Sequence, residues 1–330
     1  MPTYRIIKLK FDAPIHLGAG RDEYDQSFAS LHSDTLSAAL AAVKACRGET
    51  DDLKDFLQSF RISSAFPYSG DTLFLPKPAS LLNVAVNGRE EKDVRKQLKR
   101  IVYVEKCLWE TLAAGQKATV DPESIQKDYL VVDGKSFSVP FKKQLNQRVA
   151  VSRDGQSDAD PFYFEWLFFR PEAGLYCLVD ADDTVFDELC SLFRELGENG
   201  IGTDRSVGGG QFTITPGTIS LPENEAAEQI MLLSLYLPNE DELAALPLDR
   251  SQYGLTLRGG YMAGSTQLAY RHLRKKTVNM FVEGSLFPRP ARPLEGQVID
   301  LRPDWNDGTM HPVWRSGIPF YLPVKTSCHE

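Results

Sequence analysis

A glycine-rich segment with one arginine carries the strongest chemical signal in this sequence. Five glycines fall within eleven residues, at positions 200, 202, 208, 209 and 210. Because glycine has no Cβ, such a segment can adopt positive φ and bring backbone N–H groups close to a phosphate. The same segment supplies one guanidinium and one hydroxyl. It is therefore a candidate phosphate or RNA cradle, formed by Arg205, Ser206, Gly208, Gly209 and Gly210.

The elements expected on either side of this segment restrict the ligand. Residues 184–196 carry apolar side chains at helical spacing and residues 211–215 read as a strand, so the glycines connect a helix to a strand. Dinucleotide and P-loop sites connect a strand to a helix, and a P-loop also needs a Gly-Lys-Ser/Thr sequence that is absent here. A mononucleotide site is therefore disfavoured. The alternative without a ligand is a helix C-cap followed by a bulge.

His32 is the residue that could support catalysis. A histidine can act as general acid or base in metal-independent RNA cleavage. Such cleavage also needs a group that activates the 2′-hydroxyl and a cation for the developing charge, for which the sequence offers only Tyr24 or Lys77. The alternative is a histidine at a helix start that bonds locally, or that contacts RNA together with Ser33 and the free N–H groups there. We expect no catalytic residue.

Further cations and one aromatic residue are candidates for RNA contact, because single-stranded RNA is bound through phosphates, 2′-hydroxyls and stacked bases. These candidates are Lys77, Arg148, Arg258, Tyr261, Arg274 and Lys275. Arg258 and Tyr261 flank two glycines, so a phosphate contact and a stacking ring could lie close together. The alternatives are a surface lysine at 77, an intradomain salt bridge at Arg148 and a packed ring at Tyr261.

The charges are distributed unevenly along the chain. The 330 residues include 37 Lys and Arg against 45 Asp and Glu, a formal net charge of −8 that argues against a protein surrounded by nucleic acid on all sides. Residues 271–292 nevertheless contain six basic residues and one acid, whereas 223–242 contain six acids and no base. One face could therefore meet a phosphate backbone while another meets protein. The alternative for each run is a solvated surface.

The sequence lacks the motifs of secreted, membrane and metal-binding proteins, and this predicts the compartment and the cofactors of the protein. Residues 1–11 alternate like a strand, unlike a signal peptide, and no apolar run reaches membrane-spanning length. The five cysteines form no CxxC pair, and the five histidines form no ligand-spaced cluster with them. The sequence predicts a cytoplasmic protein with reduced thiols, no membrane contact, no metal and no cofactor.

The elements that must position these residues suggest an α+β protein with two domains. Residues 1–222 read as strand, helix, paired strands, helix and strand, which is the βαββαβ order of a ferredoxin-like (RRM-like) unit whose open sheet face often binds RNA. The predicted elements are strand 4–11, helix 35–46, strands 62–66 and 72–75, an inserted lobe over about 83–150, strands 162–169 and 174–179, helix 184–196 and strand 211–219. Residues 229–330 predict a β-rich domain, a degenerate second ferredoxin-like copy, whose one clear helix spans 241–246.

Several motifs together resemble the RAMP superfamily of CRISPR proteins, and within it the fourth Csm subunit of type III-A interference complexes. They are the G-x-G-x5-G-x-G-x-F pattern at 200–212, and the segments 31–36 (LHSDTL), 75–78 (LPKP), 258–261 (RGGY), 275–287 (KKTVNMFVEGSLF) and 311–320 (HPVWRSGIPF). One departure is Arg153-Asp154-Gly155, where related proteins often carry an Arg-x-x-Thr-Gly element.

The resemblance implies a non-catalytic subunit with two ferredoxin-like domains. Such a subunit binds the repeat-derived 5′ handle of the crRNA and lies between the large palm-domain polymerase/nuclease subunit and the adjacent backbone RAMP subunit. Two other functions remain open. One is a metal-independent CRISPR endoribonuclease using His32, as in related processing nucleases, and the other is a protein-only scaffold whose glycine loop packs against a neighbour.

Overall fold

The computed structural model describes residues 2–18, 24–151, 160–222, 227–262, 264–304 and 310–325. Arg153, Asp154 and Gly155 lie outside these ranges. Within them, none of the helices is long and apolar enough to cross a lipid bilayer.

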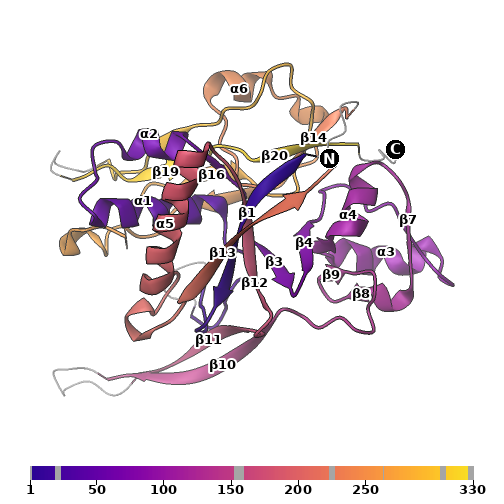
Figure 1. The fold of residues 1–330 in the computed structure, drawn as a ribbon, viewed down its shortest axis with the longest axis horizontal. Coiled ribbons are helices and arrows are strands. Elements are labelled where there is room, and N and C mark those ends of the chain that lie inside the picture. The colour runs from indigo at the N-terminus through magenta and orange to yellow at the C-terminus, as the bar shows by residue number, and fades with distance from the viewer. Residues whose placement is uncertain are drawn as a thin grey trace.

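A large mixed sheet forms the centre of the molecule (Figure 1). Its strand order is β13-β1-β12-β3-β4-β6-β9-β8, and β2 also pairs with β12. The first four strands are antiparallel to their neighbours, whereas β6 and β9 are parallel. The bounds are β1 (Thr3–Phe11), β2 (Arg61–Ile62), β3 (Phe66–Ser69), β4 (Thr72–Pro76), β6 (Tyr103–Glu105), β8 (Ile125–Gln126), β9 (Tyr129–Leu130), β12 (Ala173–Asp180) and β13 (Phe212–Ser220).

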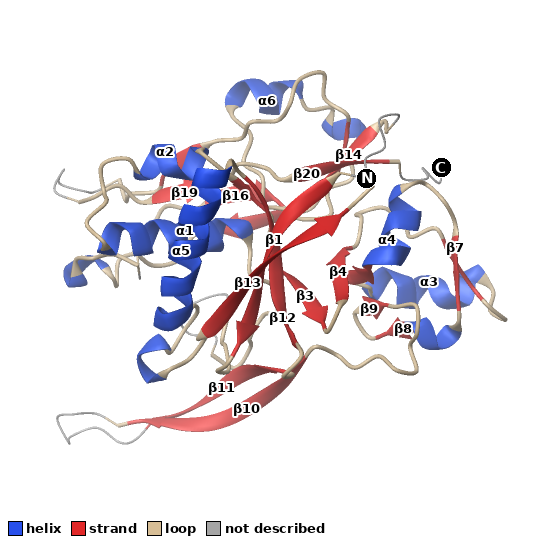
Figure 2. Ribbon diagram, viewed as in Figure 1, coloured by secondary structure: helices blue, strands red, loops and turns tan. Residues whose placement is uncertain are grey.

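Three helices cover one face of this sheet: α1 (Ser33–Cys46), α2 (Leu53–Gln58) and α5 (Asp183–Asn199) (Figure 2). Successive residues of β12 point to opposite faces, as in any strand. Cys177 therefore packs with Leu40 and Phe193 beneath the helices. The Asp182 side chain caps α5 by accepting from the Val185 N–H at 2.8 Å.

The opposite face of the sheet is also buried, so the expectation of an open sheet face for RNA is wrong. On this side Tyr176 and Leu178 of β12 pack with Leu233, Phe320 and Leu322 from the C-terminal half and with side chains of the inserted lobe. Every residue from Ala173 to Val179 is buried, because both faces of this strand are covered. Any RNA site on this chain must therefore lie elsewhere.

The inserted lobe lies at one end of the sheet and contains two helices (Figure 1). Its elements beyond the sheet strands are β5 (Val84–Val86), α3 (Glu91–Arg100), α4 (Lys106–Ala113), β7 (Ala118–Val120) and η1 (Pro122–Ser124). The strand that follows, β10 (Phe141–Ala150), pairs along its whole length with β11 (Asp160–Phe169) and forms a projecting ribbon. The two strands predicted at 162–169 and 174–179 are present but lie in different sheets, because β11 takes β10 as its partner while β12 pairs with β1 and β3.

The C-terminal half consists of short strands, as predicted, with one α-helix among its described residues. β14 (Gln229–Leu232) lies between β17 (Leu286–Pro288) and β20 (Tyr321–Val324). Two further pairs are β15 (Leu255–Arg258) with β16 (Val278–Phe281), and β18 (Val298–Asp300) with β19 (Trp314–Ser316). The helix is α6 (Glu240–Ala245), which begins with a reciprocal capping box between Asn239 and Glu242; η3 (Leu248–Arg250) and η4 (Leu268–Tyr270) are single turns of 3-10 helix.

Candidate nucleic-acid interface

A groove runs between α1, the glycine loop and the segment that follows β15; we call it the basic groove. It consists of two adjoining cavities of about 540 and 350 Å³, which share Thr35, Gly202, Thr203 and Arg258 among their lining residues. Five cations line the larger cavity, and the described lining of both cavities includes no Asp or Glu. These cations are Arg205, Arg258, Arg271, Lys275 and Arg315. A surface of one charge sign in a cleft attracts the opposite charge, here an anion.

The backbone N–H groups of the glycine loop form hydrogen bonds within the loop and to Pro14. The N–H groups of Gly208, Gly209 and Gly210 donate to the carbonyls of Arg205, Asp204 and Pro14 at 3.0, 3.1 and 2.8 Å. The three N–H groups expected to hold a phosphate therefore already have partners within the chain. The side chains of Arg205 and Ser206 remain exposed and can donate to a ligand.

The glycines are required here by close packing as well as by conformation. Gly210 has a φ of 72°, and a Cβ at this position would lie 1.9 Å from the Ile201 carbonyl oxygen. A Cβ at Gly209 would lie 2.9 Å from the Trp166 ring of β11. The loop is thus packed against the β10–β11 ribbon, which fixes where the Arg205 side chain begins.

Arg148 belongs to the support of this loop. Its guanidinium forms an ion pair with Asp204, a residue that adopts a left-handed conformation with a φ of 62°. It also stacks over the rings of Phe164 and Trp166, 4.2 and 5.3 Å from their centroids. The intradomain salt bridge left open by the sequence is the arrangement observed, and it joins β10 to the glycine loop.

His32 and Ser33 lie at the start of α1 and face the C-terminal half of the chain. The His32 Nδ1 lies 2.8 Å from Oε1 of Glu283, which also accepts from the Ser64 hydroxyl. Burial lowers the pKa of His32. The charge of Glu283 and its hydrogen bond raise the pKa by more than burial lowers it, so the net shift is upward. Ser33 accepts from the Leu235 N–H at 3.0 Å and donates its own N–H to Ser64. Both residues therefore join the two halves of the chain.

A second ionic contact joins the halves at Asp34, which is fully buried. Arg258 donates to both carboxylate oxygens, at 2.8 and 3.0 Å, and to the Thr35 hydroxyl at 2.9 Å, while Arg315 pairs with the same carboxylate. Burial raises the pKa of Asp34, but the two guanidinium groups outweigh it and hold the pKa far below its ordinary value. Removing one partner of a buried ion pair destabilises the fold by more than the intact pair stabilises it, because the remaining charge is left buried and unpaired.

Lys275 gives this cluster an excess of positive charge. Its side chain lines the basic groove and has no hydrogen-bond or ion-pair partner among the described residues. Burial, followed by the charge of Arg315, lowers the pKa of Lys275 to about 8. Three cations, Arg258, Arg315 and Lys275, thus surround one carboxylate, Asp34. An anion in the groove would compensate the excess charge.

Comparison with known proteins shows what the chain is similar to. Residues 225–324 match the CRISPR Csm4 C-terminal domain family. The protein named CRISPR system Cms protein Csm4 from Mycobacterium tuberculosis is 27% identical over 327 residues, which cover 98% of each chain. The protein of the same name from Thermococcus onnurineus is 29% identical over 304 residues, 89% of this chain and 91% of that protein. The chain is a Csm4-like RAMP protein.

Solved structures show the same fold for this Csm4-like chain. A chain in the crystal structure of a Csm1–Csm4 cassette in complex with cA4 superposes with a TM-score of 0.65 at 22% identity, covering 99% of this chain and 100% of that chain. A chain in the crystal structure of a Csm3–Csm4 subcomplex gives 0.59 at 17% identity, covering 97% and 99%. The resemblance found in the motifs is therefore confirmed, as is the mixed α+β class.

Three other residues predicted to contact RNA are Tyr261, Arg274 and Lys77, and Lys77 lies apart from the other two. Tyr261 lines the basic groove and is bridged to Arg274, whose Nε donates to the tyrosine oxygen at 3.2 Å and whose guanidinium lies 5.3 Å from the ring centroid. Lys77 lies elsewhere. Its Nζ donates to the Lys99 carbonyl at the end of α3, at 3.1 Å, and it lines a separate small cavity. Burial and the charge of Lys99 lower the pKa of Lys77.

Two cations of the basic groove were not among the predicted site residues. Arg271 lies in the basic run 271–292, and its Nε donates to the Ser265 carbonyl at 2.8 Å. Arg315 lies in the segment 311–320, which served to identify the family. No local pattern in the sequence predicts that Arg315 reaches Asp34, because 281 residues separate them.

Proposed function

We propose that this Csm4-like chain binds single-stranded RNA in the basic groove, as the subunit that holds the 5′ repeat-derived handle of the crRNA in a type III-A CRISPR complex. The observation that carries the proposal is a groove lined by five cations whose described lining has no carboxylate, in a chain of net charge −8. Exposed Arg205 and Ser206, Lys275 and the Tyr261 ring supply phosphate donors and a stacking surface.

The proposal includes two protein partners. The solved assemblies that share this fold pair Csm4 with Csm1 in one case and with Csm3 in the other. By analogy, this chain bridges the large palm-domain subunit and the first backbone subunit of its complex. Such an assembly subunit functions in the cytoplasm, where guide RNA is held.

We further propose that the halves of the chain are two ferredoxin-like domains, 1–222 and 229–330. The order β13-β1-β12-β3, with α1 after β1 and α5 after β12, is that of a split βαββαβ unit, and this supports the assignment of the first domain. The second is supported by its short antiparallel strands. The region 83–150 is an insertion in the first unit and ends in β10.

The chain is proposed to have no catalytic activity of its own. Nδ1 of His32 is bonded to buried Glu283, so this nitrogen already has a partner within the chain. Lys77, one of the two groups that could have assisted a nuclease, lies in a separate cavity. The endoribonuclease function remains an outcome of the experiment below.

The experiment measures binding and cleavage of end-labelled repeat-handle RNA by the full-length chain in EDTA over a salt series. A double variant, Arg205→Ala with Lys275→Ala, is expected to lose about tenfold or more in affinity and to reduce the salt slope by about two, one for each lost phosphate contact. Arg194→Ala, an exposed position on α5, is the matched control. Unchanged affinity of the double variant would reject the groove, and cuts abolished by His32→Ala would establish a nuclease.

A further inference from the structure

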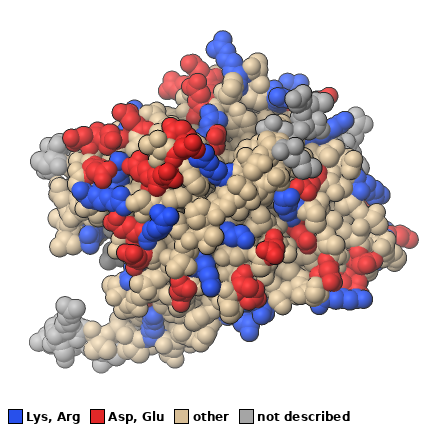
Figure 3. Space-filling model, viewed as in Figure 1, with Lys and Arg blue, Asp and Glu red and all other residues tan. Residues whose placement is uncertain are grey.

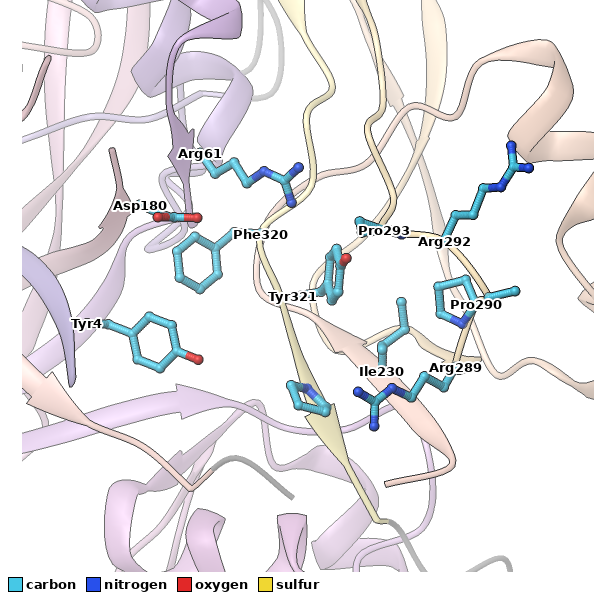
Figure 4. Close-up of a pocket in the computed structure, with 12 residues that line it drawn as sticks. Tyr4, Arg61, Asp180, Ile230, Arg289, Pro290, Arg292, Pro293, Phe320 and Tyr321 are labelled. Atoms are coloured by element: carbon cyan, nitrogen blue, oxygen red, sulfur yellow. The ribbon is translucent and has the colours of Figure 1, made fainter. Parts of the chain in front are cut away.

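A further cavity, of about 510 Å³, lies where the two halves of the chain meet. We call it the junction pocket. Figure 4 shows Tyr4, Arg61 and Asp180 of strands β1, β2 and β12 on one side of it, and Arg289 and Tyr321 on the other. It shares no lining residue with the basic groove. Ligand sites are often found at such junctions between structural units.

The charges of the junction pocket favour an anionic ligand. Arg61, Arg289 and Arg292 line it, against a single carboxylate, Asp180. Arg61 and Arg292 form no side-chain hydrogen bond or ion pair within the described part of the chain. Arginine presents several donors in a planar fork that fits a carboxylate in two-pronged fashion. The pocket therefore carries guanidinium groups whose hydrogen-bonding capacity the chain itself leaves unused.

The floor of the junction pocket is apolar and rigid. Phe320 is 3% exposed and meets Tyr4 edge to face at 5.9 Å, and Ile230 is 2% exposed. Ile230 is paired with Pro323 in the β14–β20 ladder, so both are fixed by the sheet. Prolines 290 and 293 restrict the backbone of the wall opposite. A matching ligand needs an apolar group for this floor as well as negative charges for the arginines.

We propose that the junction pocket binds an acidic peptide segment of a partner protein, with an apolar side chain against Phe320 and Ile230 and carboxylates at Arg61, Arg289 and Arg292. Charge complementarity carries this choice of ligand. A peptide fits better than RNA, because an apolar side chain suits the floor at Phe320 and Ile230, because Asp180 can accept a peptide N–H, and because the pocket is separate from the basic groove. This inference does not depend on the proposed RNA binding.

The test uses the full-length chain and a short fluorescein-labelled peptide in which glutamates flank one leucine and one phenylalanine. Fluorescence anisotropy is expected to show binding that falls at least about tenfold when glutamines replace the glutamates, and about tenfold in the double variant Arg289→Ala with Arg292→Ala. Both arginines are exposed, so the thermal unfolding midpoint should not change. Arg194→Ala serves as the control and should bind like the wild type.

Four outcomes would overturn the proposal. The glutamate peptide does not bind, or the glutamine peptide binds equally well. The double variant keeps full affinity although it is folded. Alternatively, single-stranded RNA competes with the peptide and itself loses affinity in the double variant, which would make the pocket a nucleic-acid surface. Unchanged handle-RNA affinity in the double variant Arg205→Ala with Lys275→Ala would reject the basic groove but leave this inference intact, so the two proposals fail separately.

Discussion

Two surfaces beside the helices α1, α2 and α5 carry opposite charge. One is the basic groove, and the other is an acidic surface over α2 and the start of α5. The basic groove has five cations along its described lining, and the carboxylate beside it, Asp34, is buried and paired. Acidic side chains instead gather over α2 and the N-terminal end of α5, as Figure 3 shows. These exposed acids are Asp51, Asp52, Asp55, Asp182, Asp183 and Asp187.

The difference shows why a net charge says little about a binding site. The helix α5 begins among the acids and ends at the glycine loop, so one helix spans both environments. Its acidic end also suits the helix dipole, which favours negative charge at an N-terminus. At physiological salt the two surfaces are electrostatically separate beyond about 8 Å. RNA in the groove would therefore respond to nearby cations far more than to the overall charge.

The largest expected effect is on the free energy of unfolding, when a buried carboxylate is removed instead of an exposed one. Asp34→Ala leaves Arg258, Arg315 and Lys275 close together without their anion, and we expect a loss of about 3–5 kcal/mol in the free energy of unfolding. Asp187→Ala on α5 should change it by less than about 0.5 kcal/mol. Urea unfolding of the three proteins checks both values. Equal stability of the two variants would mean that the cluster does not hold the halves together.

The second prediction separates packing from conformation in the glycine loop. Gly208 and Gly210 both have positive φ, but only Gly210 would bring a Cβ against backbone, whereas nothing lies closer than 3.9 Å at Gly208. We expect Gly208→Ala to cost about 1 kcal/mol and Gly210→Ala about 3 kcal/mol. Thermal unfolding measures both. If the costs are equal, the loop is more adaptable than its hydrogen bonds indicate.

The third prediction concerns pH. In the free chain the pKa of Lys275 is about 8, and a bound phosphate favours its charged form and raises that pKa. The contribution of Lys275 to RNA affinity is therefore fully present below about pH 8 and falls as the pH rises above this value. Each unit of pKa shift corresponds to a factor of about ten in affinity. Handle-RNA titrations at a series of pH values check this.

A matched variant isolates the lysine in the pH experiment. Lys275→Arg keeps the charge but does not lose its proton in this range, so its RNA affinity should stay constant above pH 8. The other ionisable groups near the groove keep their identity in this variant, so only the lysine is tested. These groups are His32, Glu283, Asp34, Arg258 and Arg315. A pH dependence that persists in Lys275→Arg would assign it to another group.

The smallest effect is expected on the acidic surface. Asp51→Lys with Asp55→Lys reverses two exposed charges on or beside α2, outside the lining of the basic groove. Because salt screens exposed charges, handle-RNA affinity should rise by no more than about twofold at physiological ionic strength. A much larger gain would indicate that RNA also passes over this surface.

Local patterns predicted the elements better than they predicted the contacts between elements. Alternation and helical spacing placed β1, α1, α5 and β13 correctly, because each pattern is contained within a few consecutive residues. The covered sheet face could not be predicted in this way. It depends on Phe320 and Leu322, which are distant in sequence from the strands they cover.

In the candidate site, too, the sequence predicted residues better than it predicted their contacts. Residue type and glycine spacing brought Arg205, Arg258, Tyr261 and Lys275 into consideration, and the structure places all four in one groove. The role of Arg148 was left between two alternatives, because its partner Asp204 is 56 residues away. Arg315 was not predicted at all, for the same physical reason.

The long separation between Asp34 and Arg315 has a consequence for biosynthesis. At a translation rate of about 5–20 residues per second, Arg315 is made tens of seconds after Asp34, from which it is 281 residues distant. For most of that interval Asp34 and His32 lack their partners from the C-terminal half, because Arg258 follows Asp34 by 224 residues and Glu283 follows His32 by 251. One face of the central sheet also lacks its cover until Phe320 and Leu322 are made. The nascent N-terminal half therefore exposes an ionisable and apolar surface that the ribosome or a chaperone must tolerate until the last strands emerge.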